Sequence, residues 1–193
     1  MAKNLAARAR LWWMSVMKLR SRLFAASVAA IGMFVLTHCG MPGQVLGIYS
    51  TAGTLTGNTC GAGLGAPSPW NFNVELSRET PLLYWNTMDG SPLLSGEIDD
   101  GTVNMTASSG GNVDATLDGA PGPCTMERDD SLTLAIDATS TNAPSGFTGT
   151  LTYSFSAVAG SNCADQLSAN GGLYDTLPCT VSYGLNGSYL QAN

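Results

Sequence analysis

Apolar and polar residues alternate with a period of two along most of the chain after residue 44. The clearest run is 71–78, in which Phe72, Val74 and Leu76 share one face. The polar side chains between them, including Glu75, fall on the other face. This alternation is typical of a β-strand with one side buried and the other in water.

The same pattern recurs in short segments that are separated by turn residues, and it predicts eight or nine strands with no convincing helix. These eight or nine strands are drawn from ten candidate segments, namely Val45–Leu55, Asn71–Arg78, Leu82–Asn86, Leu93–Ile98, Thr102–Thr106, Val113–Leu117, Ser131–Asp137, Thr148–Val158, Cys179–Leu185 and Ser188–Ala192. Asp100-Gly101 and Asn186-Gly187 predict tight hairpin turns, and Ser108–Asn112 and Ala120–Asp130 are expected to be loops.

Strands that follow one another without intervening helices indicate an antiparallel meander, so the chain is expected to be all-β. An up-and-down barrel and a two-sheet sandwich both satisfy the pattern. We prefer the barrel, because hairpins follow one another and closure removes exposed strand edges. Residues 45–193 would form this single domain, which resembles the small lipocalin-like lipoproteins in architecture, although it has no lipocalin motif.

An uncharged apolar run, Leu23–Thr37, follows Lys18, Arg20 and Arg22. A basic flank before an apolar core is the pattern of a secretory signal, and the run is shorter than the ~20 residues of a membrane-spanning helix. Residues 1–38 are therefore expected to be a signal peptide. A start at Met17 would give a signal of ordinary proportions.

The end of this run, Leu36-Thr37-His38-Cys39, resembles the lipobox of bacterial lipoproteins. His38 departs from the Gly, Ala or Ser usual at its position. The resemblance implies that Cys39 is diacylated and becomes the mature N-terminus, with residues 39–44 as a tether. Gly40 is not the Asp that retains many such proteins at the inner membrane, so the resemblance implies an outer-membrane location, facing the periplasm or the cell surface.

The charge is divided at Cys39. Only Arg78 and Arg128 are basic after it, against all 14 acidic residues, so the mature side chains sum to −12. An acidic domain repels nucleic acid and anionic lipid surfaces, which leaves the lipid anchor as the expected link to the membrane.

Four cysteines, Cys60, Cys124, Cys163 and Cys179, remain after Cys39. In an exported chain an even number predicts two disulfides. Sequence allows three connectivities, and we favour Cys163–Cys179 with Cys60–Cys124. The spacing has no C-x-x-C pair, so a zinc site is weakly supported.

The mature part lacks the residues of many active sites. The only histidine, His38, would leave with the signal, and no lysine follows Cys39. Ser-His-Asp and Cys-His catalysis, histidine-ligated metals and Schiff-base chemistry are therefore excluded. We expect no enzyme activity, cofactor or metal.

Carboxylates remain as candidates for other chemistry. Glycoside hydrolysis needs two of them, and an alternative hydrolase would use Glu75, Glu97, Asp99 or Asp100 near Trp70 and Trp85. A loop calcium site would use oxygen atoms from Asp99, Asp100, Asp129 and Asp130.

The expected function is a non-catalytic lipoprotein that binds a small apolar ligand or an envelope protein. Aromatic residues, namely Trp70, Trp85, Tyr84, Tyr153 and Tyr183, would form the barrel core, and some of them would line an interior cavity. A structural or assembly role is the alternative, and a completely filled interior would favour it.

Overall fold

A computed structural model describes residues 41–113, 123–136 and 143–191 of the chain. The expected signal peptide, Cys39 and most of the expected strand Val113–Leu117 lie outside the described residues.

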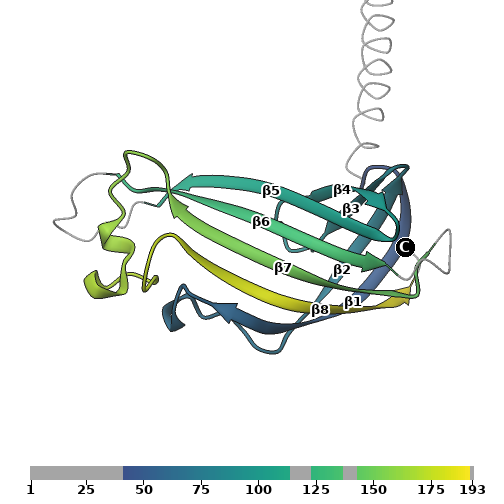
Figure 1. The fold of residues 1–193 in the computed structure, drawn as a ribbon, viewed down its shortest axis with the longest axis horizontal. Helices are drawn as coiled ribbons and strands as arrows, with labels where there is room; N and C mark the ends of the chain where they lie inside the picture. The colour runs from purple at the N-terminus through teal and green to yellow at the C-terminus, as the bar shows by residue number, and fades with distance from the viewer. Residues whose placement is uncertain (1–40, 114–122, 137–142, 192–193) are drawn as a thin grey trace, which may run out of the picture. The chain divides into compact units, whose positions relative to one another are not determined.

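The described chain is a closed antiparallel barrel in which every strand pairs with the next and β8 pairs with β1 (Figure 1). This confirms the up-and-down barrel and excludes the sandwich. The strands are β1 (Gln44–Asn58), β2 (Trp70–Glu79), β3 (Leu82–Asn86), β4 (Leu94–Asp99), β5 (Thr102–Asn112), β6 (Thr125–Ile136), β7 (Gly146–Ala157) and β8 (Cys179–Gln191).

The expected loop Ser108–Asn112 is wrong, because β5 continues through it. The expected loop Ala120–Asp130 is wrong from Thr125, where β6 begins, and its residues 120–122 lie outside the described residues. These segments pair residue by residue, from Thr106 opposite Ser131 to Asn112 opposite Thr125. No apolar alternation marks this part of β6 as a strand, because Arg128 and Asp130 occupy positions where an alternating strand would place apolar residues.

The two expected hairpin turns have different outcomes. Asp100 and Gly101 connect β4 to β5 with φ of 45° and 76°, which confirms the first turn, because a type I′ hairpin needs positive φ at both positions. Asn186-Gly187 is no turn: β8 runs through it without interruption. A Cβ at residue 187 would overlap the ring of Phe147, so the glycine makes room for an aromatic side chain inside the barrel.

One half of the barrel interior is filled with apolar side chains. Trp85, Leu76, Leu83 and Leu134 are each 0% exposed, and the ring centroids of Trp85 and Phe147 are 5.3 Å apart. We call this half, where β1 begins and β2 ends, the filled end. On the outer face of β2, Glu75 and Ser77 are buried rather than wet as expected, and Ser77 Oγ donates a 2.5 Å hydrogen bond to the carbonyl oxygen of Pro42.

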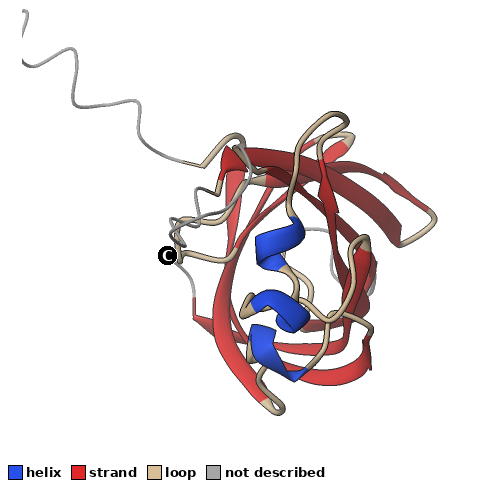
Figure 2. Ribbon diagram, turned by 90° about the vertical axis from the view of Figure 1, so that its left-hand side faces the viewer, coloured by secondary structure: helices blue, strands red, loops and turns tan. Residues whose placement is uncertain are grey.

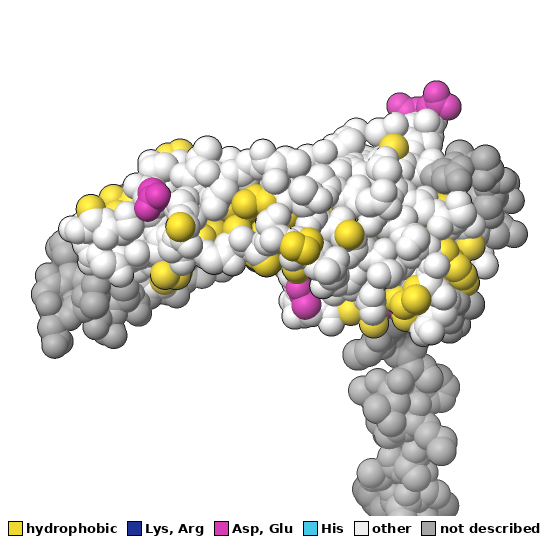
Figure 3. Space-filling view, turned by 90° about the horizontal axis from the view of Figure 1, so that it is seen from below, with side chains coloured by type: hydrophobic (Ala, Val, Ile, Leu, Met, Phe, Trp, Pro, Cys, Tyr) yellow, Lys and Arg dark blue, Asp and Glu magenta, His cyan; other side chains and the backbone are white. Residues whose placement is uncertain are grey.

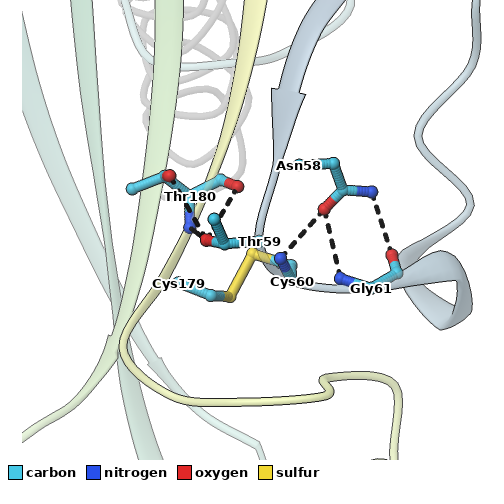
Figure 4. Close-up of a disulfide and its surroundings, with 6 residues drawn as sticks. All are labelled: Asn58, Thr59, Cys60, Gly61, Cys179 and Thr180. Carbon is cyan, nitrogen blue, oxygen red and sulfur yellow. Dashed lines mark hydrogen bonds between the residues drawn. A yellow bond between two sulfur atoms is a disulfide. The ribbon is translucent and has the colours of Figure 1, made fainter.

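The disulfides are Cys60–Cys179 and Cys124–Cys163, so the pairing favoured from the sequence is wrong. Barrel closure brings the end of β1 beside the start of β8. There, next to the first disulfide, the amide of Thr59 donates a 2.8 Å hydrogen bond to the carbonyl oxygen of Thr180 (Figure 4). The second disulfide joins the residue before β6 to the loop after β7. Proximity in the sequence therefore misled the expectation, and the sheet order decided the pairing.

Three short 3-10 helices lie at the other end of the barrel: η1 (Ala62–Leu64), η2 (Ala164–Gln166) and η3 (Ser168–Asn170). Each of these helices has three residues, so the expectation of no substantial helix agrees with the structure of the described residues. Seen from that side, the helices lie across the ring of strands (Figure 2). We call this end the mouth. Within the described residues, no helix has both the length and the apolarity to span a membrane.

Candidate functional site: the barrel mouth

The side chains that reach the mouth continue the inward-facing rows of the filled end. Residues opposite each other on neighbouring strands point to the same face of a sheet. Asp130, Tyr153 and Val181 form one such row across β6, β7 and β8, and Arg128 lies opposite Phe155 in the next. The barrel pattern therefore brings two charged side chains and two aromatic ones into the interior.

The interior is hollow at this end. A cavity of about 320 Å³ opens there. One wall is formed by residues 64–67, which are the last residue of η1 and the three that follow it, and the inner strand faces form much of the rest. This volume lies at the lower limit of the ~300–1,000 Å³ of small-molecule sites, so the cavity suits a small ligand.

Aromatic rings make up much of the remaining wall. Trp70, Tyr153, Phe155 and Tyr183 line the cavity. The ring centroids of Trp70 and Tyr183 are 5.1 Å apart, and those of Trp70 and Tyr153 are 6.4 Å apart. Three of the aromatic residues expected in the interior thus line the cavity, while Trp85 packs in the filled end. The expectation is wrong for Tyr84, which alternates with Trp85 and lies on the outer face of β3, where its hydroxyl donates to Glu79 Oε2 at 3.3 Å.

Arg128 and Asp130 form a two-pronged ion pair beside these rings. Arg128 Nη2 donates to Asp130 Oδ2 at 2.8 Å, and Arg128 Nε lies 2.8 Å from Asp130 Oδ1. The Asp130 side chain is 4% exposed, whereas that of Arg128 is 31% exposed. Burial raises the pKa of Asp130, although the hydrogen bond and charge of Arg128 act in the opposite direction.

The guanidinium carbon of Arg128 also lies 5.1 Å from the centroid of the Tyr153 ring, within the range of a cation–π contact. Burial raises the pKa of the Tyr153 phenol, and the negative charge of Asp130 adds to this effect. Tyr153 therefore stays neutral at ordinary pH.

A third charged residue, Asp89, lines the cavity from the β3–β4 loop. Its Oδ1 accepts hydrogen bonds from Thr87 Oγ1 at 2.6 Å and from the Ser91 amide at 2.9 Å. Partial burial alone would raise the pKa of Asp89, but these hydrogen bonds outweigh it and lower the pKa. Asp89 is therefore a fixed anion at the mouth.

A smaller hollow of about 250 Å³ shares Arg128 and Phe155 with the first cavity and extends past Tyr174 and Met126. The rings of Phe155 and Tyr174 have centroids 5.6 Å apart. The side chains of Arg128 and Phe155 thus have a hollow on each side, and the ion pair with Asp130 keeps the guanidinium between them.

A search of protein-family models finds none that matches this chain, and neither curated proteins nor solved structures give a match. The cavity, its rings and its charges therefore have to carry the functional inference by themselves.

The carboxylates of the hydrolase alternative do not gather at the mouth. Glu75 alternates with the inward residues of β2, so it lies on the opposite face of the strand from Trp70. Glu97, Asp99 and Asp100 are exposed on β4 and the turn after it. The structure thus does not bring these acids to the tryptophans that were expected beside them.

The calcium candidates are also dispersed. Asp129 and Asp130 are adjacent on β6, where the first is exposed and the second is buried. In the part of the chain that the structure describes, no three acidic, cysteine or histidine side chains group closely enough to hold a metal ion.

Sequence reasoning missed Asp89 and Arg128 as site residues. Asp89 falls between the expected strands Leu82–Asn86 and Leu93–Ile98, and Arg128 falls in the expected loop Ala120–Asp130. One signal was available for Arg128, since it is one of two basic residues after Cys39 and is followed by acids at 129 and 130.

Proposed function

We propose that this chain is a non-catalytic lipoprotein of the cell envelope, and that its barrel binds a small ligand in the mouth cavity. The observation that carries the proposal is the division of the interior. Trp85 and its neighbours fill one half without exposure, while the other half holds a cavity of about 320 Å³. A purely structural barrel gains stability from complete packing, so the hollow half favours a binding role.

The composition supports a binding role over catalysis. The residues after Cys39 contain no histidine and no lysine. The two inward charged residues, Arg128 and Asp130, contact each other at two points, each at 2.8 Å. Neither group is poised as an acid, base or nucleophile, whereas the aromatic walls offer contact area.

The anchor part of the proposal depends on Cys39 and on the direction of β1. Cys39 precedes the first residue of β1, Gln44, by a short tether. Since β1 begins at the filled end, a diacylated Cys39 would be joined to the barrel through that end of β1. Two acyl chains suffice for stable anchoring.

Metabolic labelling with palmitate tests the anchor. The wild-type full chain, expressed in a Gram-negative host, should incorporate label and fractionate with the outer membrane. Cys39→Ser should do neither, and Cys39→Ser that still incorporates label would refute the anchor.

Ligand binding is tested on the full chain in lipid vesicles, with empty vesicles as the blank. Benzyl alcohol, a neutral aromatic probe, should bind saturably by calorimetry. Trp70→Leu, which removes a cavity wall, should weaken binding, whereas Tyr189→Leu, an exposed aromatic residue toward the end of β8, should not. Equal effects of the two substitutions would refute the mouth as the binding site.

A further inference from the structure

The charges at the mouth do not cancel. Arg128 and Asp130 neutralise each other through their two contacts. The hydrogen bonds that Asp89 accepts from Thr87 and Ser91 come from neutral groups. Of the described residues, those that line this cavity, counted with Asp130 as the partner of Arg128, therefore carry one net negative charge.

The cavity is also lined by aromatic rings that pack against one another, and Trp70 stacks on Phe72 with ring centroids 4.2 Å apart. Trp70 lies 5.1 Å from Tyr183 and 6.4 Å from Tyr153, measured between ring centroids. The faces of such rings carry negative electrostatic potential and attract ammonium groups, most strongly for tryptophan. Tyr153 already shows this behaviour, because the Arg128 guanidinium lies 5.1 Å from its centroid.

We propose that the mouth selects a small organic cation, such as a substituted or quaternary ammonium group on an apolar body. The positive group would lie between Trp70 and Asp89, and the apolar body would contact Phe155 and Val181. This inference rests on the proposed function, since it names the class of ligand that the mouth cavity holds.

A ligand anion is disfavoured by the same contacts. Arg128 donates one hydrogen bond to Asp130 through Nη2 and makes a second contact through Nε, and the Asp130 side chain is 4% exposed. A carboxylate that took over Arg128 would leave Asp130 buried without its partner, which is a costly state. It would also meet the charge of Asp89.

The negative electrostatic potential of the whole domain also favours a cation over an anion. The mature side chains sum to −12, and a strongly acidic surface raises the local concentration of cations and their association rate. On the face seen in Figure 3, hydrophobic side chains gather along the middle and the charged side chains that are visible are acidic.

Three water-soluble probes with the same benzyl group separate the possibilities: benzyltrimethylammonium, benzyl alcohol and phenylacetate. Each is titrated by calorimetry into the full chain in vesicles of zwitterionic lipid, at low and at high salt. We expect the cation to bind most tightly and the anion most weakly. Added salt should weaken binding of the cation and leave that of the neutral alcohol unchanged.

Asp89→Asn tests the assigned charge. It should weaken binding of the cation by up to about fivefold, as for one partly exposed ion pair, and should change the neutral alcohol by less than twofold. Glu97→Gln is the matched control, because it removes one exposed acid on β4, next to the filled end, where Glu97 pairs with Leu82. It should leave both probes unchanged.

The outcomes are distinct for the two proposals. If the cation and the alcohol bind equally, or if phenylacetate binds best, the cation inference is refuted and the mouth remains a binding site. If Asp89→Asn and Glu97→Gln weaken the cation equally, the general field rather than Asp89 is responsible and the assigned site is wrong. If no probe binds, both proposals fail.

Discussion

Removing each disulfide separately should destabilise the barrel by different amounts, because the two bridges close loops of different length. Cys60–Cys179 spans 119 residues and Cys124–Cys163 spans 39. In the chain-entropy model, loops of these sizes correspond to about 4.9 and about 3.9 kcal/mol of stabilisation. The expected difference is therefore about 1 kcal/mol.

Side-chain packing should cancel in this comparison. All four cysteines are buried, with exposures of 0%, 2%, 7% and 3% for Cys60, Cys124, Cys163 and Cys179. Replacement of either pair by alanine therefore removes two buried sulfur atoms at the same end of the barrel. What distinguishes the two variants is the length of loop that is released in the unfolded chain.

Urea denaturation of the wild type and of the two double-alanine variants, followed by circular dichroism, measures this difference. Peptide mapping under non-reducing conditions first checks the pairing. Cys60→Ala/Cys179→Ala should be the less stable variant. A larger loss for Cys124→Ala/Cys163→Ala would refute the loop-entropy reasoning, and a peptide that contains Cys163 linked to Cys179 would refute the connectivity.

Three further predictions concern the filled end. Gly187→Ala should destabilise the barrel by about 1–3 kcal/mol, because its Cβ would overlap the Phe147 ring; Phe147→Leu in the same chain should recover part of this loss in a urea double-mutant cycle. Trp85→Ala should cost about 3–5 kcal/mol, because the side chain is 0% exposed, whereas Tyr84→Ala on the outer face of β3 should cost under about 1 kcal/mol. Burial, aided by Tyr189, raises the pKa of Tyr49 from 10.0 to about 12, so the folded state holds the proton more tightly and stability should fall as pH rises from 10 towards 12. Tyr49→Phe should reduce that slope in urea midpoints measured against pH, because Tyr153, whose pKa is also raised, still contributes to it, and a slope that is unchanged would contradict the assignment.

The fold class could be predicted because each strand of the filled end buries one face. Leu132 and Leu134 on β6, and Val103 and Met105 on β5, lie inward as their alternation predicts. The turn at Asp100-Gly101 was predictable for a local reason, since few residues tolerate two consecutive positive φ angles. These signals depend only on near neighbours in the sequence.

The expectations that proved wrong depend on contacts between residues that are far apart in the chain. Gly187 appeared to be a turn residue because nothing in its own segment reveals the Phe147 ring that occupies its place. The cysteine pairing depended on which strand ends become neighbours when β8 closes against β1. Arg128 broke the apolar alternation of β6, and its partner Asp130 shows that polar residues in this strand mark the hollow half rather than a loop.

The location of the cross-links fits the division of the interior. A cavity removes packing contacts that would otherwise stabilise the surrounding strands, and the strands around the mouth have lost those contacts. Both disulfides lie at that end: one joins the end of β1 to the start of β8, and the other joins the start of β6 to the loop after β7. Cross-links act on the unfolded chain and need no filled interior. They can therefore stabilise the barrel without filling the mouth, so the end of the barrel that lacks packing contacts is the end that carries both disulfides.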